Sequence, residues 1–417
     1  PPSPRRHATF ALAGSTLLLL LVLALLAGAY RLPAPRAVDA PALQFSAGRA
    51  IEALAFVLGD QAPHPVGSPA NAAVRARLVE RLRALGHVPE IQHGYHCDYW
   101  DLCAAVDNII VRIPGREPGP AIALSAHYDS VGAAPGAADD GIGLAVILEI
   151  ARLLPARGEP PRHPLLLLIT DGEELALNGA ASFVAESPLA AEVRATVNLD
   201  AIGNAGPAIL FETGRASAEL IARLAATAPS PVANSAWPVA FRRMPNDTDF
   251  SVFRRAGWQG YNYALSGRVH HYHTPLDNLA NLDAGAVQHM GDNALAALDS
   301  LAAQTAPAAG ARYDRGAEPA LSCAEQSAYA ELARRMLLHG SVSGLQWVSS
   351  VSLLTLLLFA GRLLRGGSIA LRPLLTGTVL IGGSLLATGA ASLVLVGLLR
   401  AAGAMPPASA WYGWTAQ

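Results

Sequence analysis

Residues 165–174 read Leu-Leu-Leu-Leu-Ile-Thr-Asp-Gly-Glu-Glu, an uninterrupted apolar run that ends in carboxylates. Such a run, bounded by turn residues, is typical of a strand that is buried on both faces of a sheet. Similar apolar runs lie at 109–111, 121–124 and 195–199, and helical spacing of apolar residues marks 70–85, 141–154, 216–226 and 283–303. Buried strands that alternate with helices predict an α/β fold with a mostly parallel central sheet flanked by helices.

The residues that follow these strands carry acids and imidazoles. In an open α/β sheet, ligands bind beyond the carboxyl ends of the strands. The chain places there, or in neighbouring loops, His127 and Asp129, Asp139 and Asp140, Asp171, Glu173 and Glu174, Asp200, and the cluster His270, His271 and His273. Carboxylates packed together repel one another and raise each other's pKa values. A divalent cation removes this repulsion, so the joint pattern predicts a metal site.

Each of these clusters has a simpler interpretation by itself. An Asp pair before a helix is typical of an N-cap, which is the simpler role for Asp140.

Imidazoles and carboxylates together suit zinc, with Co²⁺ or Mn²⁺ as substitutes. Three carboxylates carry more charge than a typical site for one zinc ion. We therefore expect two ions, roughly 3.5–4 Å apart, that share one carboxylate.

The order of these motifs resembles the M28 group of zinc peptidases. The resemblance rests on His127-x-Asp129, Asp139-Asp140-Gly-x-Gly, Asp171-Gly-Glu173-Glu174, Asp200 and His273-Thr, and it covers residues 45–304. Apolar segments before and after this domain predict an N-terminal anchor and C-terminal helices, with the domain outside the cytoplasm. This layout resembles the branch of the family that contains the endoplasmic-reticulum metallopeptidase and the vacuolar membrane protease. That branch has more C-terminal spans, and the chain begins at Pro1. We therefore expect either a truncated chain or a shorter bacterial version.

The resemblance implies a role for each metal ligand. His127 and Asp200 would bind one zinc ion, and Glu174 and His273 would bind the other. Asp139 would bridge the two ions. Within the histidine cluster the resemblance selects His273, because Thr-Pro follows it directly, and His271 is the second choice.

The resemblance also implies three supporting roles. Glu173 would be the general base, and adjacent residues of an extended chain point in opposite directions, so its neighbour Glu174 can face the metal. Asp129 would hydrogen-bond the far nitrogen of His127 and fix its tautomer. Tyr272 would stabilise the tetrahedral oxyanion, with simple packing as the alternative.

The implied activity is hydrolysis of peptide bonds by a membrane-bound zinc exopeptidase. Two alternatives stay open at this point. Glutaminyl cyclases share the fold and much of the motif, but they use one zinc ion for acyl transfer within an N-terminal glutamine. Receptor-like relatives have lost catalysis, although such decay usually removes ligands that are present here.

The direction of exopeptidase action is less defined, and we favour an aminopeptidase over a carboxypeptidase. The arginines Arg242, Arg243 and Arg268 can bind a substrate carboxylate or simply be exposed to solvent, and Pro245–Phe250 is expected near the cleft.

The 30 basic and 32 acidic residues give a net charge of −2, which offers no general attraction to nucleic acid. The expected partners are a peptide substrate and a lipid bilayer, with the oligomeric state open.

Three apolar segments predict membrane spans. Hydrophobic residues make up 52% of the chain and charged residues 15%, against about 25% in a typical soluble domain. The segments 8–30, 341–361 and 373–399 approach or exceed the roughly 20 residues that cross a bilayer. Arginines before the first segment and between the other two place these ends in the cytoplasm. A cleaved signal peptide is the alternative for 8–30, and buried helices of a soluble domain for the other two.

This topology divides the chain into seven parts. They are a cytoplasmic tip, anchor and linker at 1–44, a non-cytoplasmic catalytic domain at 45–304, a linker at 305–340, a transmembrane helix at 341–361, a cytoplasmic loop at 362–372, a transmembrane helix at 373–399 and a tail at 400–417. The Ala-rich composition without lysine favours a bacterial periplasm, with a eukaryotic lumen as the alternative. In such a compartment Cys97 and Cys103 can form a disulfide, and free thiols are the alternative.

Overall fold

The computed structural model describes residues 31–98, 101–215, 217–241, 244, 246–303, 327–332 and 334–366, together with a few residues between 16 and 24. The chain divides into two compact units, Pro1–His339 and Gly340–Gln417, which are described separately. The predicted span at 373–399 and most of the one at 8–30 lie outside the described residues.

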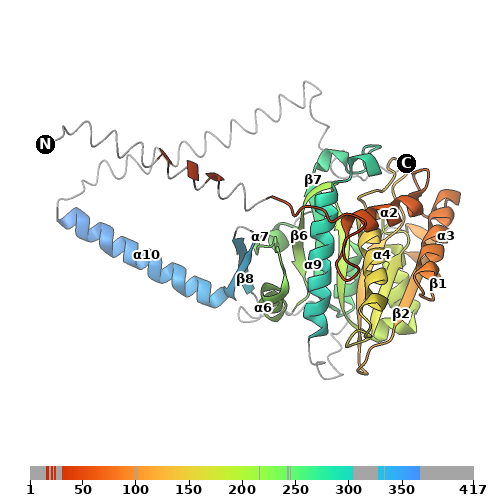
Figure 1. Cartoon of the computed structure of the whole chain (residues 1–417). Coiled ribbons are helices and arrows are strands. Elements are labelled where there is room, and N and C mark those ends of the chain that lie inside the picture. The colour runs from red at the N-terminus through yellow and green to blue at the C-terminus, as the bar shows by residue number, and fades with distance from the viewer. Residues whose placement is uncertain are drawn as a thin grey trace. The chain divides into compact units, whose positions relative to one another are not determined.

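A seven-stranded sheet forms the centre of the first unit (Figure 1). Its strands are β1 (Glu90–Cys97), β2 (Cys103–Ile113), β3 (Ala121–His127), β4 (Leu165–Thr170), β5 (Val193–Ala201), β6 (Ala205–Thr213) and β7 (Gln259–Gly267). Their order across the sheet is β1-β2-β4-β3-β5-β7-β6. The four inner strands β4, β3, β5 and β7 run parallel, and β1, β2 and β6 are antiparallel to their neighbours. This confirms the predicted α/β fold with a mostly parallel centre.

The apolar run in β4 is continuous because helices cover both faces of the sheet. Every residue of β3 and β4 is buried. Leu165, Leu167 and Ile169 pack into the larger hydrophobic core, whereas Leu166 and Leu168 pack into a second core on the opposite face. A strand in this position has no solvent side, so polar residues appear only where it ends.

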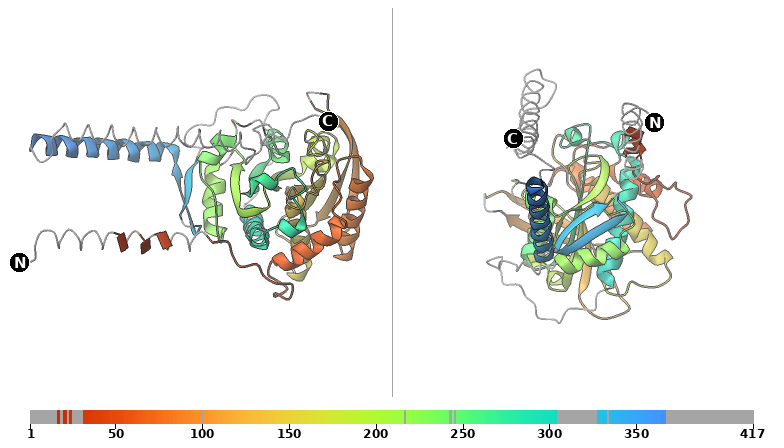
Figure 2. Two further views of the ribbon diagram at one scale, coloured as in Figure 1. Left: turned by 90° about the horizontal axis from the view of Figure 1, so that it is seen from above. Right: turned by 90° about the vertical axis from the view of Figure 1, so that its left-hand side faces the viewer.

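Helices lie on the two faces of the sheet (Figures 1 and 2). The larger core is covered by α2 (Ala47–Leu58), α4 (Gly141–Ala156) and α9 (Ala284–Ala302), with α3 (Pro69–Ala84) packed outside them. On the other face lie α5 (Asn178–Glu186) and α8 (Asp249–Arg255). Beside the β6 edge lies α7 (Ala236–Phe241), and α6 (Ser217–Thr227) packs against α9. The predicted helices at 70–85, 141–154, 216–226 and 283–303 correspond to α3, α4, α6 and α9.

Two strands occupy part of the stretch that was expected to be a linker. β8 (Ser327–Leu332) and β9 (Met336–Ser341) form a separate sheet, which Figure 2 shows alongside α6. The backbone carbonyl of Tyr329 accepts hydrogen bonds from the backbone N–H and the hydroxyl of Ser235. The Ala-, Gly- and Pro-rich composition of 305–319 gives no sign of these strands further along.

One helix among the described residues is long and apolar enough to cross a membrane. It is α10 (Val342–Arg365), whose candidate span, Val342–Phe359, falls within the predicted segment 341–361. Its last turn carries Arg362 and Arg365.

Cys97 and Cys103 form a disulfide in the first unit. They face each other in the register of the antiparallel β1–β2 pair, with their Cα atoms 4.0 Å apart. The structure therefore supports the disulfide alternative over free thiols.

Candidate metal centre

The predicted site residues meet at the carboxyl ends of the parallel strands. His127 ends β3, Asp200 lies near the end of β5, and Glu174 follows β4. His273 follows β7 in a loop that begins with the short 3₁₀ helix η2 (Val269–His271). Asp139 lies in the loop that leads into α4. The sheet topology thus brings together residues that are up to 146 positions apart in the sequence, from 127 to 273.

Asp140 caps α4 and leaves Asp139 to face the site. One Asp140 carboxylate oxygen accepts a hydrogen bond from the Gly143 N–H at 3.0 Å, and the other accepts from the His127 N–H at 3.3 Å. This agrees with the N-cap interpretation of Asp140. The peptide bond that joins Asp139 to Asp140 is cis.

The glycine of the Asp-Asp-Gly-x-Gly motif at Gly143 permits a close approach of α4 to β3. A Cβ atom on Gly143 would lie 2.6 Å from the Cβ of Ala126 and would overlap the Asp140 carboxylate. Glycine is therefore the side chain that this packing accommodates without a shift of the helix.

Two groups of metal-binding side chains share Asp139. Ligand atoms of His127, Asp139 and Asp200 lie within 4.8 Å of one another, and so do those of Asp139, Glu174 and His273. His127 Nε2 lies 3.3 Å from Asp139 Oδ1, and His273 Nε2 lies 3.1 Å from Asp139 Oδ2. His273 Nε2 is also 3.2 Å from Glu174 Oε2. The structure brings all five predicted ligands together, with the predicted bridge in both groups.

Several of these ligand atoms are buried and make no hydrogen bond. They are His127 Nε2, Asp139 Oδ2, Glu174 Oε1 and His273 Nε2. Buried polar atoms nearly always have a hydrogen-bond partner, so a cluster without partners calls for an explanation. Imidazole nitrogens and carboxylate oxygens at this spacing are the donors that zinc and related divalent cations bind. The residues present therefore fit a divalent metal.

The electrostatics of the cluster point the same way. Burial and the nearby Asp139 charge raise the pKa of Asp200 to about 8 and that of Glu174 to about 7. Without a cation, these carboxyl groups hold protons near neutral pH. A bound cation favours the ionised form of each ligand, so metal binding and proton release are coupled.

Asp139 and its histidines are shifted in opposite directions. Burial by itself raises the pKa of Asp139, but the imidazoles of His127 and His273 outweigh it and hold that pKa well below its usual range. Burial lowers the pKa of His273, yet Asp139 and Glu174 reverse this and raise it to about 10. Among the three carboxyl groups of the proposed ligands, that of Asp139 ionises most readily.

Asp129 connects the His127 and Glu173–Glu174 segments. Its carboxylate accepts hydrogen bonds from the backbone N–H groups of Glu173 at 3.0 Å and Glu174 at 3.2 Å. The Nδ1 atom of His127 lies 3.0 Å from the backbone carbonyl of Asp129 and 3.4 Å from its carboxylate. Asp129 thus lies where it can orient the imidazole, and it also holds the loop that carries both glutamates.

Glu173 and Tyr272 lie beside the two ligand groups. Burial raises the pKa of Glu173 well above its ordinary value, and the charges of Asp200, Asp249 and Glu174 add to this effect. The Tyr272 ring stacks on the His273 ring, with centroids 3.7 Å apart. Burial raises the pKa of Tyr272, so its hydroxyl stays protonated and can donate a hydrogen bond.

His271 lies outside both ligand groups. Its Nδ1 atom is 2.7 Å from the side-chain nitrogen of Asn204, which also donates to the Leu276 carbonyl. The residue that the motif ranked first, His273, is the one whose imidazole enters the cluster.

Sequence reasoning missed Asp277 and the role of Asp249. Asp277 is buried and accepts hydrogen bonds from the loop that carries Asp139. Asp249, at the start of α8, accepts a hydrogen bond from the Thr170 hydroxyl at 2.5 Å, and burial raises its pKa to about 6. The signal for Asp277 is its position four residues after His273.

Residues 108–298 match the model of Peptidase family M28. The chain is 32% identical over 227 residues to endoplasmic reticulum metallopeptidase 1 of Mus musculus, which covers 54% of this chain and 25% of that protein. It is 30% identical over 250 residues to the vacuolar membrane protease of Candida dubliniensis, with 56% and 26% covered. The chain therefore spans about a quarter of the length of these relatives.

Solved structures of lower identity share the fold. A glutaminyl cyclase of Porphyromonas gingivalis is 20% identical with a TM-score of 0.50, covering 63% of this chain and 100% of that chain. A leucine aminopeptidase precursor of Bacteroides thetaiotaomicron is 18% identical with a TM-score of 0.50, covering 62% and 98%. Since both likenesses are equal and show the fold alone, they do not separate a cyclase from a peptidase.

Proposed function

Because residues 108–298 match the model of Peptidase family M28, we propose that the chain is a membrane-bound exopeptidase that hydrolyses peptide bonds with two divalent metal ions. The observation that carries this proposal is the pair of ligand groups that share Asp139. His127, Asp139 and Asp200 would hold one ion. Asp139, Glu174 and His273 would hold the other. Zinc is the expected metal, with Co²⁺ or Mn²⁺ as substitutes.

The metal ions would supply Lewis acidity, which polarises the peptide carbonyl and lowers the pKa of water toward ~7. Glu173 is the general base in this proposal. Its raised pKa suits a group that takes a proton from the attacking water and returns it to the leaving amine. Asp129 keeps this base in register with the ligands, because it binds the backbone of Glu173 and contacts His127.

Tyr272 is the proposed hydrogen-bond donor to the developing oxyanion. Its ring is fixed by stacking on His273, and its raised pKa keeps the hydroxyl proton available. A fixed donor aimed at developing charge stabilises the transition state more than the ground state.

We propose aminopeptidase rather than carboxypeptidase action. Of the three arginines that could bind a substrate carboxylate, Arg268 donates to the Asn281 carbonyl at 3.0 Å on the exposed surface. Arg242 and Arg243 lie outside the described residues.

The catalytic domain is proposed to lie on the non-cytoplasmic side of the membrane, in the periplasm of a bacterium. The disulfide between Cys97 and Cys103 supports an oxidising compartment. The arginines at the end of α10 support a cytoplasmic position for that end.

The activity is tested on the purified full chain with dipeptides blocked at either the N- or the C-terminus, and metal content is measured on the same sample. The proposal predicts hydrolysis of the C-blocked dipeptide and not of the N-blocked one, with two ions per chain. Hydrolysis of the N-blocked dipeptide alone would establish a carboxypeptidase. Formation of a pyroglutamyl product from an N-terminal glutamine peptide, with one ion per chain, would replace the proposal with a cyclase.

A further inference from the structure

The loop that carries His273 adopts a backbone conformation that needs support. His273 has a φ of +54°, in the left-handed region that non-glycine residues rarely adopt. Such a conformation persists only where surrounding contacts hold it in place. Within the loop, the Thr274 hydroxyl donates to the His271 carbonyl at 2.7 Å, and the Asp277 N–H donates to the Thr274 carbonyl at 3.0 Å.

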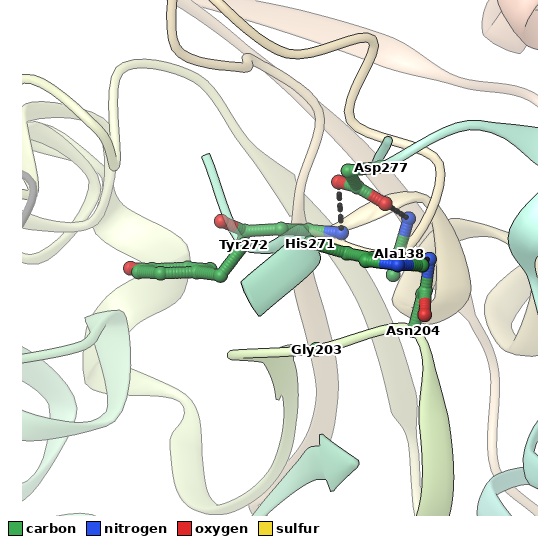
Figure 3. Close-up of a pocket in the computed structure, with 7 residues that line it drawn as sticks. Ala138, Gly203, Asn204, His271, Tyr272 and Asp277 are labelled. Carbon is green, nitrogen blue, oxygen red and sulfur yellow. Dashed lines mark hydrogen bonds between the residues drawn. The ribbon is translucent and has the colours of Figure 1, made fainter. Parts of the chain in front are cut away.

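Asp277 joins this loop to the segment that carries Asp139 (Figure 3). Its Oδ1 accepts a hydrogen bond from the Ala138 N–H at 2.7 Å, and its Oδ2 accepts from the Asp139 N–H at 3.2 Å. Its backbone carbonyl accepts a third bond from the Ala137 N–H at 3.3 Å. The residue as a whole is 2% exposed, so these bonds form away from solvent.

These contacts bear unequally on the two ligand groups. The group of Asp139, Glu174 and His273 takes two of its three members from the segments that Asp277 connects. The group of His127, Asp139 and Asp200 takes only Asp139 from them. A loss of the Asp277 contacts would therefore separate His273 from Asp139, while His127 and Asp200 stay at the ends of their strands.

We propose that Asp277 is a positioning residue that sets the spacing between His273 and Asp139. It thereby determines the affinity of the ion held by Asp139, Glu174 and His273. This inference rests on the proposed function, because it requires a metal at each ligand group. Asp277 itself would contact neither metal nor substrate, and it would act through its hydrogen bond to the backbone N–H of Asp139.

Graded substitutions and a matched control separate positioning from general stability. Asp277→Ala removes both side-chain acceptors. Asp277→Asn keeps one acceptor oxygen and replaces the other with an amide nitrogen, which cannot accept, so either the Ala138 or the Asp139 N–H loses its acceptor. The control is Asp283→Ala, since Asp283 also accepts from two backbone N–H groups, those of Gly285 at 2.8 Å and Ala286 at 3.1 Å, but caps α9 and belongs to neither ligand group.

The test is a Co²⁺ titration of the purified, metal-free full chain, followed by the visible absorption of the bound ion and by calorimetry. Wild type is expected to bind two ions. Asp277→Ala is expected to weaken one of the two by roughly 10- to 100-fold, the usual effect of removing a residue that orients a ligand. Asp277→Asn should fall between it and wild type, and Asp283→Ala should match wild type at both ions.

Three results would overturn the inference. Wild-type affinity for both ions in Asp277→Ala would remove the positioning role while leaving the proposed function intact. An equal loss of Co²⁺ affinity in Asp283→Ala would show that the loss in Asp277→Ala reflects general destabilisation of the fold and not positioning of His273. A wild-type chain that binds no Co²⁺ would refute the proposed function, and the inference with it. If Asp277→Ala does not fold, Asp277→Asn decides, because unchanged affinity in that variant contradicts the proposal.

Discussion

The Asp129 carboxylate shows how one buried side chain can organise two segments of a site. It accepts hydrogen bonds from consecutive backbone N–H groups of Glu173 and Glu174, and its own backbone carbonyl contacts the His127 imidazole. The resemblance to the M28 peptidases implies a hydrogen bond between Asp129 and His127, and in the structure the Asp129 backbone carbonyl (3.0 Å) lies closer to the imidazole than its carboxylate does (3.4 Å). The sequence does not predict the bonds to the glutamate loop, because these join residues whose proximity depends on the neighbouring positions of β3 and β4 in the sheet.

Glu173→Gln should abolish most turnover while leaving the metal content unchanged. The substitution keeps the size of the side chain but removes the group proposed to carry the proton. General base catalysis typically contributes 10²–10⁴-fold, so we expect a fall in kcat of about that size. Steady-state kinetics on C-blocked dipeptides and metal analysis of the same preparation check this. Near-normal turnover in Glu173→Gln would remove Glu173 from the mechanism.

At the scale of elements, strands with a run of mainly apolar residues are predicted from the sequence. β3, β4 and β5 contain such runs, although Asn198 in β5 is polar and buried. β7 is not predicted, because Gln259, Gly260 and buried Asn262 leave only a short apolar stretch. This side chain is satisfied by Asn198 at 3.0 Å and by the Thr248 hydroxyl at 2.9 Å, both brought close by tertiary structure. Asp277 is missed for the same reason, since its partners are 138 and 139 positions away.

Gly143→Ala should destabilise the protein by displacing the start of α4. Its Cβ would lie 2.6 Å from the Ala126 Cβ, and overpacking of this kind typically costs about 1–3 kcal/mol. Gly132→Ala is the matched control, because no atom lies within 4 Å of a Cβ at that glycine. Denaturant unfolding of both variants tests this. Equal stability of the two variants would mean that the contact of α4 with β3 is looser than described.

His289 in α9 should make the fold less stable in mild acid. Its Nδ1 accepts a hydrogen bond from the Ala208 N–H at 3.0 Å, which requires a neutral ring. Burial, helped by the Arg334 charge, lowers its pKa from 6.5 to about 4. The unfolded chain therefore gains a proton first as the pH falls. The associated stability is complete above about pH 6.5 and is lost between there and pH 4, by up to about 3 kcal/mol.

The comparison of wild type with His289→Gln isolates this effect from other acidic groups. The free energy of unfolding of the variant, measured from pH 8 to pH 4, should fall less steeply than that of wild type. Parallel curves for the two proteins would show that His289 is not the group responsible.

At the scale of the whole molecule, we propose that the domain at 45–304 lies on the non-cytoplasmic side of the membrane. The disulfide between Cys97 and Cys103 lies in the first unit, and Arg365 lies at the end of α10 in the second. The positive-inside rule predicts that these two positions lie on opposite sides of a bilayer. The apolar segments and the arginines beside them predict this arrangement, and it stays a prediction. β8 and β9 are not predicted from the sequence, because short strands after an Ala-rich stretch leave little pattern.

Thiol labelling in spheroplasts tests the arrangement. With Cys323 replaced by serine, an impermeant maleimide should label Cys97 and Cys103 only after treatment with an impermeant reductant. A cysteine introduced by Arg365→Cys into a chain without other cysteines should react only after lysis. The reverse pattern would place the catalytic domain in the cytoplasm.

The central claim is that five side chains hold two divalent ions through a shared carboxylate, and the metal content of the purified chain tests it most directly. We expect two zinc ions per chain, one per chain in Asp200→Ala, and none or nearly none in Asp139→Ala, because Asp139 belongs to both ligand groups. X-ray absorption should place the two ions roughly 3.5–4 Å apart. A single ion per chain that survives the Asp139→Ala substitution would contradict the account.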